Sequence, residues 1–195
     1  MGAVLCCAVL SWLASGVAYA TNIQIVQLDE QAAASDVVVE GSVERQWYET
    51  PALAHGVAVT RSLVTVTHEY KGHVASGQVV VTTPGGIDAD GVEYSIAATP
   101  RLAIGDVVIV HLIASDESQA RLHNWAAGLL FLGDGTAPVL DGQRRPVSVD
   151  AEGRVLPLVD GRLDEALRVD DARQLVADSV VDGGRSISGY TGGGL

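Results

Sequence analysis

A short run of β-branched residues, Ser35–Val43 (SDVVVEGSV), constrains the fold of this chain more than any other stretch. Residues of this kind suit the pleated, half-buried surface of a β-strand. Because successive side chains of a strand point to opposite faces, three valines are expected to face a core: Val37, Val39 and Val43. Glu40 and Ser42 then face the other way, and Gly41 marks a bend or a bulge. We therefore predict a strand here on which the rest of the fold is built.

Further strand signals follow along the chain, each ended by a turn signal. The predicted strands are Asn22–Leu28, Thr60–Tyr70, Gly77–Thr83, Val107–Ile113, a segment within Arg121–Leu132 broken near Gly128, and a hairpin of Pro146–Asp150 with Arg154–Val159. Val107–Ile113 (VVIVHLI) is apolar almost throughout, which is typical of a strand buried on both faces. The segments Glu49–Val57 and Gly85–Tyr94 hold glycine or proline and are predicted loops.

Two helical segments complete the pattern. Leu28–Ala34 is rich in good helix formers and predicts a short helical turn. Residues 161–181 have an amphipathic period with Asp164 and Glu165 in the expected first turn, as the helix dipole prefers. Many short strands and one late helix indicate a mainly β protein: a small, OB-like antiparallel β-barrel over 21–160. The glycine-rich end, 182–195, is predicted to be disordered.

The first twenty residues, MGAVLCCAVLSWLASGVAYA, contain no charged side chain and end in the small-x-small pattern Ala18-Tyr19-Ala20. This pattern predicts a signal peptide over 1–20 and an exported protein, periplasmic or extracellular. A transmembrane anchor is the alternative, because the stretch is nearly long enough to span a bilayer. Cleavage after Ala20 would remove both cysteines, Cys6 and Cys7, and so exclude disulfides and cysteine sites from the mature chain.

The formal charge of −12 lies entirely in the part that follows the predicted signal peptide. Such acidity argues against binding to nucleic acid or to anionic membranes, since both repel a negative surface. It favours solubility, a basic partner or cations. We expect no stable membrane insertion once the signal peptide has been removed.

Four segments in order resemble exported bacterial proteins of uncharacterised function: SDVVVEGSV (Ser35–Val43), VTVTHEYKG (Val64–Gly72), VVVTTPGG (Val79–Gly86) and PRLAIGDVVIVHL (Pro100–Leu112). The same arrangement is similar to the netrin-like domains of tissue inhibitors of metalloproteinases. The resemblance implies a five-stranded OB-type barrel and, by analogy of fold, inhibition of an exported metalloprotease. Those inhibitors present an N-terminal cysteine to the target's zinc, whereas the predicted mature chain begins at Thr21 and holds no cysteine. No inhibitory residue is transferred.

The histidines do not form a recognisable metal motif. His68 and His73 (HEYKGH) are five positions apart and separated by Gly72, unlike the H-E-x-x-H zinc helix. His111, inside an apolar strand, is expected to be a core or rim histidine bonded to a neighbour. Motifs for a nucleophile elbow or a phosphate loop are absent from the sequence.

The predicted loop Gly85–Tyr94 contains Asp88-Ala89-Asp90-Gly91, which begins like a calcium loop. The twelfth position, where an EF-hand needs glutamate, is Thr99, so that motif fails. A surface calcium site using Asp88, Asp90 and Glu93 stays open beside the simpler interpretation of an acidic turn. No other cofactor is expected.

We predict a non-enzymatic binding domain that recognises a protein or peptide partner through its barrel loops. The candidate contact residues are Asp88, Asp90, Glu93, Trp47 and Tyr48. The alternatives are an inhibitor of an exported metalloprotease and a hydrolase whose active site is dispersed along the chain. A pocket with a carboxylate beside a histidine would favour the hydrolase.

Overall fold

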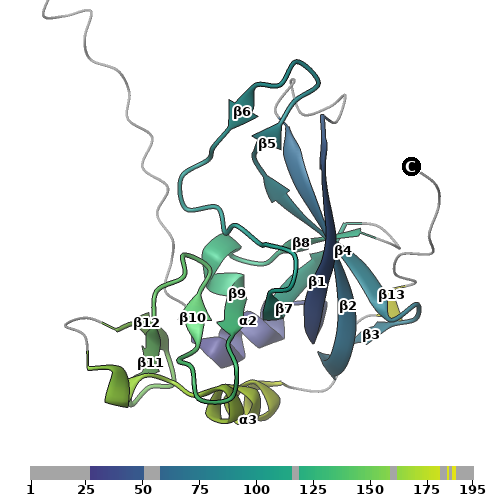
Figure 1. The fold of residues 1–195 in the computed structure, drawn as a ribbon. Helices are drawn as coiled ribbons and strands as arrows, with labels where there is room; N and C mark the ends of the chain where they lie inside the picture. The colour runs from purple at the N-terminus through teal and green to yellow at the C-terminus, as the bar shows by residue number, and fades with distance from the viewer. Residues whose placement is uncertain are drawn as a thin grey trace, which may run out of the picture.

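Five strands close into a barrel in the computed structural model (Figure 1). Around the barrel they are β1 (Val37–Glu49), β2 (Val59–Lys71), β4 (Gln78–Pro84), β8 (Gln119–Leu122) and β7 (Val107–Ala114), and β7 pairs back with β1. Every neighbouring pair is antiparallel except β4–β8, which is parallel. The prediction of a mainly β, OB-like barrel is confirmed. Two further strands, β9 (Leu129–Leu132) and β10 (Leu140–Asp141), extend the sheet from β7.

The structure describes residues 27–50, 58–115, 119–158, 162–180, 184 and 186–187. The predicted signal peptide, residues 22–26 of the predicted strand Asn22–Leu28, most of the predicted loop at 49–57 and most of the glycine-rich tail lie outside these residues. Leu28, the last residue of that predicted strand, is instead the first residue of a helix. Within the described ranges, none of the helices has the length and apolar character needed to cross a membrane.

The predicted strand Ser35–Val43 forms the first part of β1, which pairs with both β2 and β7 and so closes the barrel. Its alternating valines Val37, Val39 and Val43 are buried in the barrel core, as expected. The pairing of β1 with β2 shifts register between Glu40 and Gly41, which confirms the predicted irregularity. A side chain at Gly41 would collide with the backbone oxygen of Thr65, so only glycine lets the two strands approach here.

The outer side of β1 is also covered, because a second apolar cluster packs there under two helices. Those helices are α2 (Leu28–Ala34) and α3 (Val169–Ser179). The cluster joins Val38 and Ile109 of the barrel to residues Val169, Ala172 and Val176 of α3. The buried ammonium of Lys71 closes the end of α2 by donating hydrogen bonds to the Ala32 and Ala33 carbonyls, at 2.8 and 3.0 Å. The strands β1 and β7 therefore have a hydrophobic core on each face.

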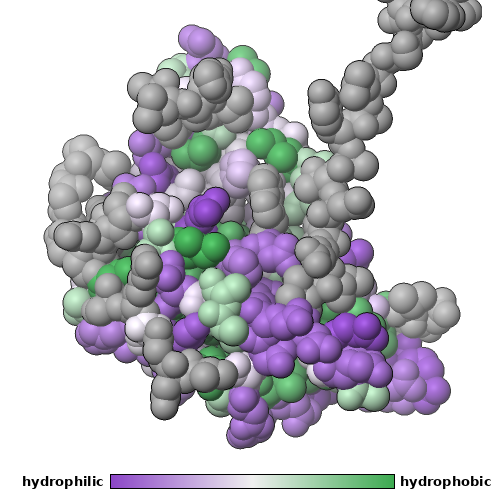
Figure 2. Space-filling view, turned by 180° about the vertical axis from the view of Figure 1, so that it is seen from behind, coloured by the Kyte–Doolittle hydropathy of each residue, from purple (hydrophilic) through white to green (hydrophobic). Residues whose placement is uncertain are grey.

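The predicted helices are found, with one change of boundary. The first matches Leu28–Ala34. The second begins at Val169 rather than at 161, with Asp170 and Asp171 in its first turn, and a separate 3₁₀ turn covers Leu163–Glu165. Hydrophilic residues gather over the lower part of the molecule in Figure 2, where α3 and the hairpin of β11 (Val147–Val149) and β12 (Val155–Pro157) lie in Figure 1.

Short elements fill the connections. The predicted late hairpin forms as β11 (Val147–Val149) and β12 (Val155–Pro157). A 3₁₀ turn at Trp125–Gly128 separates β8 from β9, where the sequence predicts a break. Within the tail that the sequence predicts to be disordered, β13 (Ser186–Ile187) pairs in parallel with β3 (His73–Val74). Ser186 and Ile187 are therefore ordered, contrary to the prediction. Ile187 is buried against the barrel core, which explains why this pair is ordered.

Candidate functional site

A cavity of about 280 Å³ lies at the mouth of the barrel. It exists because β1 and β2 each run for 13 residues, whereas β7 pairs with β1 only over Val37–Ser42. The far ends of β1 and β2 project beyond the closed barrel and form one wall of the cavity, together with the end of β4. Barrel mouths are frequent positions for binding sites in proteins.

The other wall is a small hairpin within the predicted loop Gly85–Tyr94. Its strands are β5 (Gly86–Ile87) and β6 (Glu93–Tyr94). The hairpin joins the barrel through two hydrogen bonds: the Thr60 hydroxyl donates to the Gly85 carbonyl at 2.8 Å, and the Gly85 amide donates to the Ala58 carbonyl at 2.9 Å. In Figure 1 this hairpin lies at the opposite end of the molecule from α3.

Glycine is required where the hairpin leaves the barrel. Gly86 has φ +144°, a conformation that other residues rarely adopt. A Cβ atom at this position would lie 2.8 Å from Cδ1 of Tyr48. The aromatic ring of Tyr48 therefore packs against bare backbone, which keeps it at the edge of the mouth, where Tyr48 is 53% exposed.

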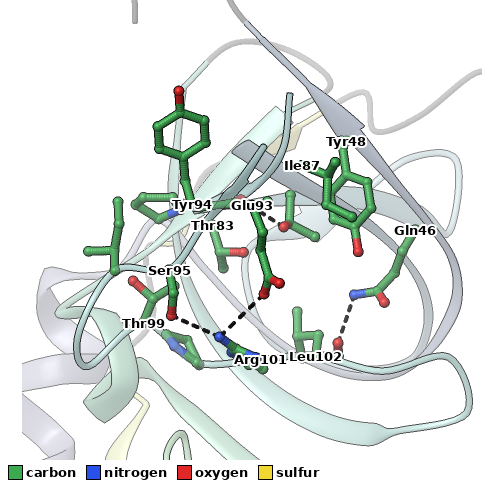
Figure 3. Close-up of a pocket in the computed structure, with 16 residues that line it drawn as sticks. Gln46, Tyr48, Thr83, Ile87, Glu93, Tyr94, Ser95, Thr99, Arg101 and Leu102 are labelled. Atoms are coloured by element: carbon green, nitrogen blue, oxygen red, sulfur yellow. Dashed lines mark hydrogen bonds and ion pairs between the residues drawn. The ribbon is translucent and has the colours of Figure 1, made fainter. Parts of the chain in front are cut away.

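Charged and polar groups meet inside the mouth. Figure 3 shows Glu93 and Arg101 pointing toward each other, with Tyr48 and Gln46 on the other side of the cavity. The Arg101 guanidinium donates to the Ser95 hydroxyl at 2.8 Å and lies 3.8 Å from the Glu93 carboxylate. The Gln46 amide donates to the Leu102 carbonyl at 2.9 Å and so links β1 to the segment that closes the mouth.

The predicted contact residues do not share one surface. Tyr48 and Glu93 both line the cavity, while Asp88 and Asp90 lie in the turn of the hairpin. Trp47 is next to Tyr48 in β1 and so points to the opposite face of the strand, where the Arg45 guanidinium lies 5.0 Å from its ring centre.

Asp88 has a structural function in the hairpin turn. One oxygen of its carboxylate accepts hydrogen bonds from the Asp90 and Val92 amides, at 3.0 and 2.8 Å. The same carboxylate bonds to the Tyr94 hydroxyl, which raises the pKa of Tyr94. Figure 3 shows the Tyr94 ring directed away from the cavity. Over the described ranges, no three histidine, cysteine, aspartate or glutamate side chains are grouped to hold a metal ion.

The histidines occupy separate environments, and His55 lies outside the described residues. His73 is exposed and pairs with Glu69 at 2.9 Å, and His68 contacts the Tyr70 ring edge-on. His111 is fully buried, and burial lowers its pKa to about 4, an effect that the Gly128 backbone partly offsets. Neither ring nitrogen of His111 makes a hydrogen bond of good geometry, so the predicted bond to a neighbour is absent among the described residues.

A second depression, a groove of about 470 Å³, lies between β2 and α3. Glu40, His68, Tyr70 and Arg173 are among the residues that line it. Burial raises the pKa of Glu40, but the hydrogen bonds from Arg173 and Tyr70 outweigh burial, so the net pKa of Glu40 lies below its ordinary value. Glu40 is therefore an ionised, paired carboxylate.

Sequence reasoning identifies two of the residues that line the mouth, Tyr48 and Glu93, and misses Gln46 and Arg101. A lone glutamine in a strand and a lone arginine in a loop carry no pattern of their own. Comparison with models of protein families and with curated proteins finds no match for this chain.

Proposed function

We propose that this chain is an exported, non-enzymatic binding domain that holds a segment of a protein or peptide partner in the mouth of its barrel. The observation that carries the proposal is the cavity between the β5–β6 hairpin and the ends of β1 and β2, with Tyr48 exposed at its edge. Loops on a rigid barrel are a common location for binding, because the scaffold fixes their ends. Export is predicted from residues 1–20.

The size of the mouth favours a segment of a larger partner. Cavities that enclose whole small molecules usually measure roughly 300–1,000 Å³, so about 280 Å³ suits one or two side chains. The edge also presents large side chains to solvent: Tyr48 is 53% and Ile87 is 39% exposed. Exposed aromatic residues of this kind often anchor protein interfaces.

The test is to fill the mouth without disturbing the barrel. Ser95 is exposed and lines the cavity, so Ser95→Trp should occupy the space while the fold is retained. Peptides selected from a random displayed library on the unmodified protein should bind this variant at least tenfold more weakly. Ala151→Trp, at an exposed turn of the β11–β12 hairpin, is the matched control and should bind normally. Equal binding by both variants would exclude the mouth as the site.

A hydrolase is the second candidate, and the groove between β2 and α3 favours it because a carboxylate and a histidine line the same groove. Both oxygens of Glu40 already accept hydrogen bonds, however, from Arg173 and Tyr70. A general base must be able to accept a proton, so Glu40 would first have to leave Arg173. Ester and peptide substrates hydrolysed by the protein, but not by a His68→Gln variant, would favour this candidate over binding.

A further inference from the structure

Glu93 is the carboxylate that projects into the mouth. Its side chain is 66% exposed, and its charged partner in the described part of the chain is Arg101, at 3.8 Å. That distance is at the outer limit of an ion pair, and the Arg101 side chain is 72% exposed. Pairs between two groups this exposed contribute about 0–1 kcal/mol, so a ligand can displace Arg101 at little cost.

Arg101 is held in place mainly by a neutral hydroxyl. Its guanidinium donates to Ser95 at 2.8 Å, which is closer than its approach to Glu93. Figure 3 shows the guanidinium at the lower edge of the cavity, below Glu93. Arg101 thus occupies the position beside Glu93 that a cation from another molecule would take.

The facing wall suits a cation as well. Tyr48 lines the same cavity, with its ring packed against the backbone of Gly86. The face of an aromatic ring attracts an ammonium or guanidinium group that lies within about 6 Å of its centre. A carboxylate on one wall and a tyrosine on the other form a combination that suits the head group of lysine or arginine.

The charge around the mouth has the same sign as that of the whole chain. The β5–β6 hairpin carries Asp88, Asp90 and Glu93, and Arg101 is the one basic side chain among the described residues that line the cavity. The whole chain has a formal charge of −12. This field increases the local concentration of cationic groups and disfavours anionic ones.

We propose that the mouth recognises a lysine or arginine side chain of the bound segment, with Glu93 as the counter-ion, Tyr48 as the aromatic wall and Arg101 as an internal substitute that the ligand displaces. This inference rests on the proposed function and names the chemistry of the segment.

The probes are N-acetyl-arginine amide and N-acetyl-citrulline amide, which have nearly the same shape but differ in charge. Titration of each into the full chain, followed by NMR amide shifts of the hairpin, should show about fivefold weaker binding of citrulline. Glu93→Gln should weaken arginine binding about fivefold, and Arg101→Met should strengthen it by about threefold, because Glu93 is then free. Glu152→Gln, an exposed carboxylate on another hairpin that pairs with Arg154, is the control and should change nothing.

Opposite results would overturn the inference. Equal binding of the two probes would exclude charge recognition without use of any variant. If Arg101→Met abolished binding of the selected peptides, the mouth would instead bind an anion through Arg101. Peptide capture that Ser95→Trp abolishes but that tolerates citrulline in place of arginine would leave the proposed function intact and remove only this inference. Capture unaffected by Ser95→Trp would remove both proposals, whereas no binding of either small probe would remove only this inference.

Discussion

The carboxylate of Glu40 and the guanidinium of Arg173 form a two-point ion pair between residues 133 positions apart in sequence. The Arg173 nitrogens lie 2.7 and 3.0 Å from the two carboxylate oxygens, and the Tyr70 hydroxyl donates to one of them at 3.1 Å. Glu40 lies where β1 shifts register, and Arg173 lies in α3. The pair therefore ties the late helix to the strand from which the barrel is built.

Arg173→Met is expected to lower the free energy of unfolding by about 2 kcal/mol. The substitution leaves the carboxylate of Glu40, a residue that is only 7% exposed, without its charged partner. The loss of free energy is limited because the Arg173 side chain is itself partly exposed. Urea unfolding measures this. Arg162→Met is the control, because Arg162 pairs with Asp164 and Glu165 at the surface and its loss should cost less than about 0.5 kcal/mol. Equal losses would show that the Glu40 pair stabilises no more than a surface pair.

The contribution of Glu40 to stability should depend on pH. Its pKa is lowered in the folded state from the ordinary 4.5, so the stabilisation is complete above about 4.5 and is lost as the pH falls through the lower, folded value. The difference in free energy of unfolding between the unmodified protein and Glu40→Gln should therefore be constant near neutral pH and should shrink in acid. A difference that is the same from pH 7 to pH 3 would contradict this prediction.

His111 should make the free energy of unfolding decrease as the pH falls from 6.5 to 4. Its pKa is lowered in the folded state to about 4, so the unfolded chain takes up a proton that the folded chain refuses in this range. The effect amounts to roughly 3 kcal/mol. His111→Leu should remove this pH dependence and should be at least as stable at pH 7, because among the described residues neither ring nitrogen makes a hydrogen bond of good geometry.

Gly41→Ala should destabilise the barrel by about 2–3 kcal/mol. The added methyl group would collide with the Thr65 carbonyl and lie 2.7 Å from Cγ1 of Val64, so β2 would have to move away from β1. Thermal and urea unfolding measure the loss. The matched control is Gly135→Ala, where a methyl group would meet nothing within 4 Å. A Gly41→Ala protein as stable as this control would show that the strands separate easily.

Gly86→Ala should both destabilise the hairpin and displace Tyr48. Gly91→Ala is the matched control: Gly86 and Gly91 both have positive φ, but a methyl group at 91 has open space, whereas one at 86 meets the Tyr48 ring at 2.8 Å. Strain of about 1 kcal/mol is expected in both variants, and a further loss, with weaker peptide binding, only at 86. Equal effects on peptide binding would mean that the position of Tyr48 is not important.

Local patterns of the chain predicted most of the elements. Leu28–Ala34 is helical because its residues are good helix formers, and Val107–Ala114 is a buried strand because it is apolar on both faces. The sequence predicts the start of the late helix at 161, eight residues before α3 begins at Val169, because residues 163–165 also contain acidic residues suited to a first turn. The burial of Glu40 was not predicted, since its partner Arg173 is 133 positions away and no local pattern joins them.

The candidate site was only partly visible in the sequence. The sequence predicts Gly85–Tyr94 as a loop that binds a partner, but the carboxylate of Asp88 accepts hydrogen bonds from the backbone of its own turn. Tyr48 and Glu93 line opposite sides of the mouth because the hairpin that follows Gly85 lies beside the end of β1. Such an arrangement depends on the path of the chain through space, which alternation and turn signals do not encode.

The sequence by itself determined the barrel strands β1, β2, β4 and β7, the first helix, the irregularity at Gly41 and the strongly acidic charge. These features follow from side-chain preferences and from periods of two or 3.6 residues, which act over a few positions. Only the tertiary structure decided the parallel pairing of β4 with β8, the second core under α2 and α3, and the mouth between Tyr48 and Glu93. These depend on closing the barrel, because closure decides which distant segments become neighbours and which polar groups leave water.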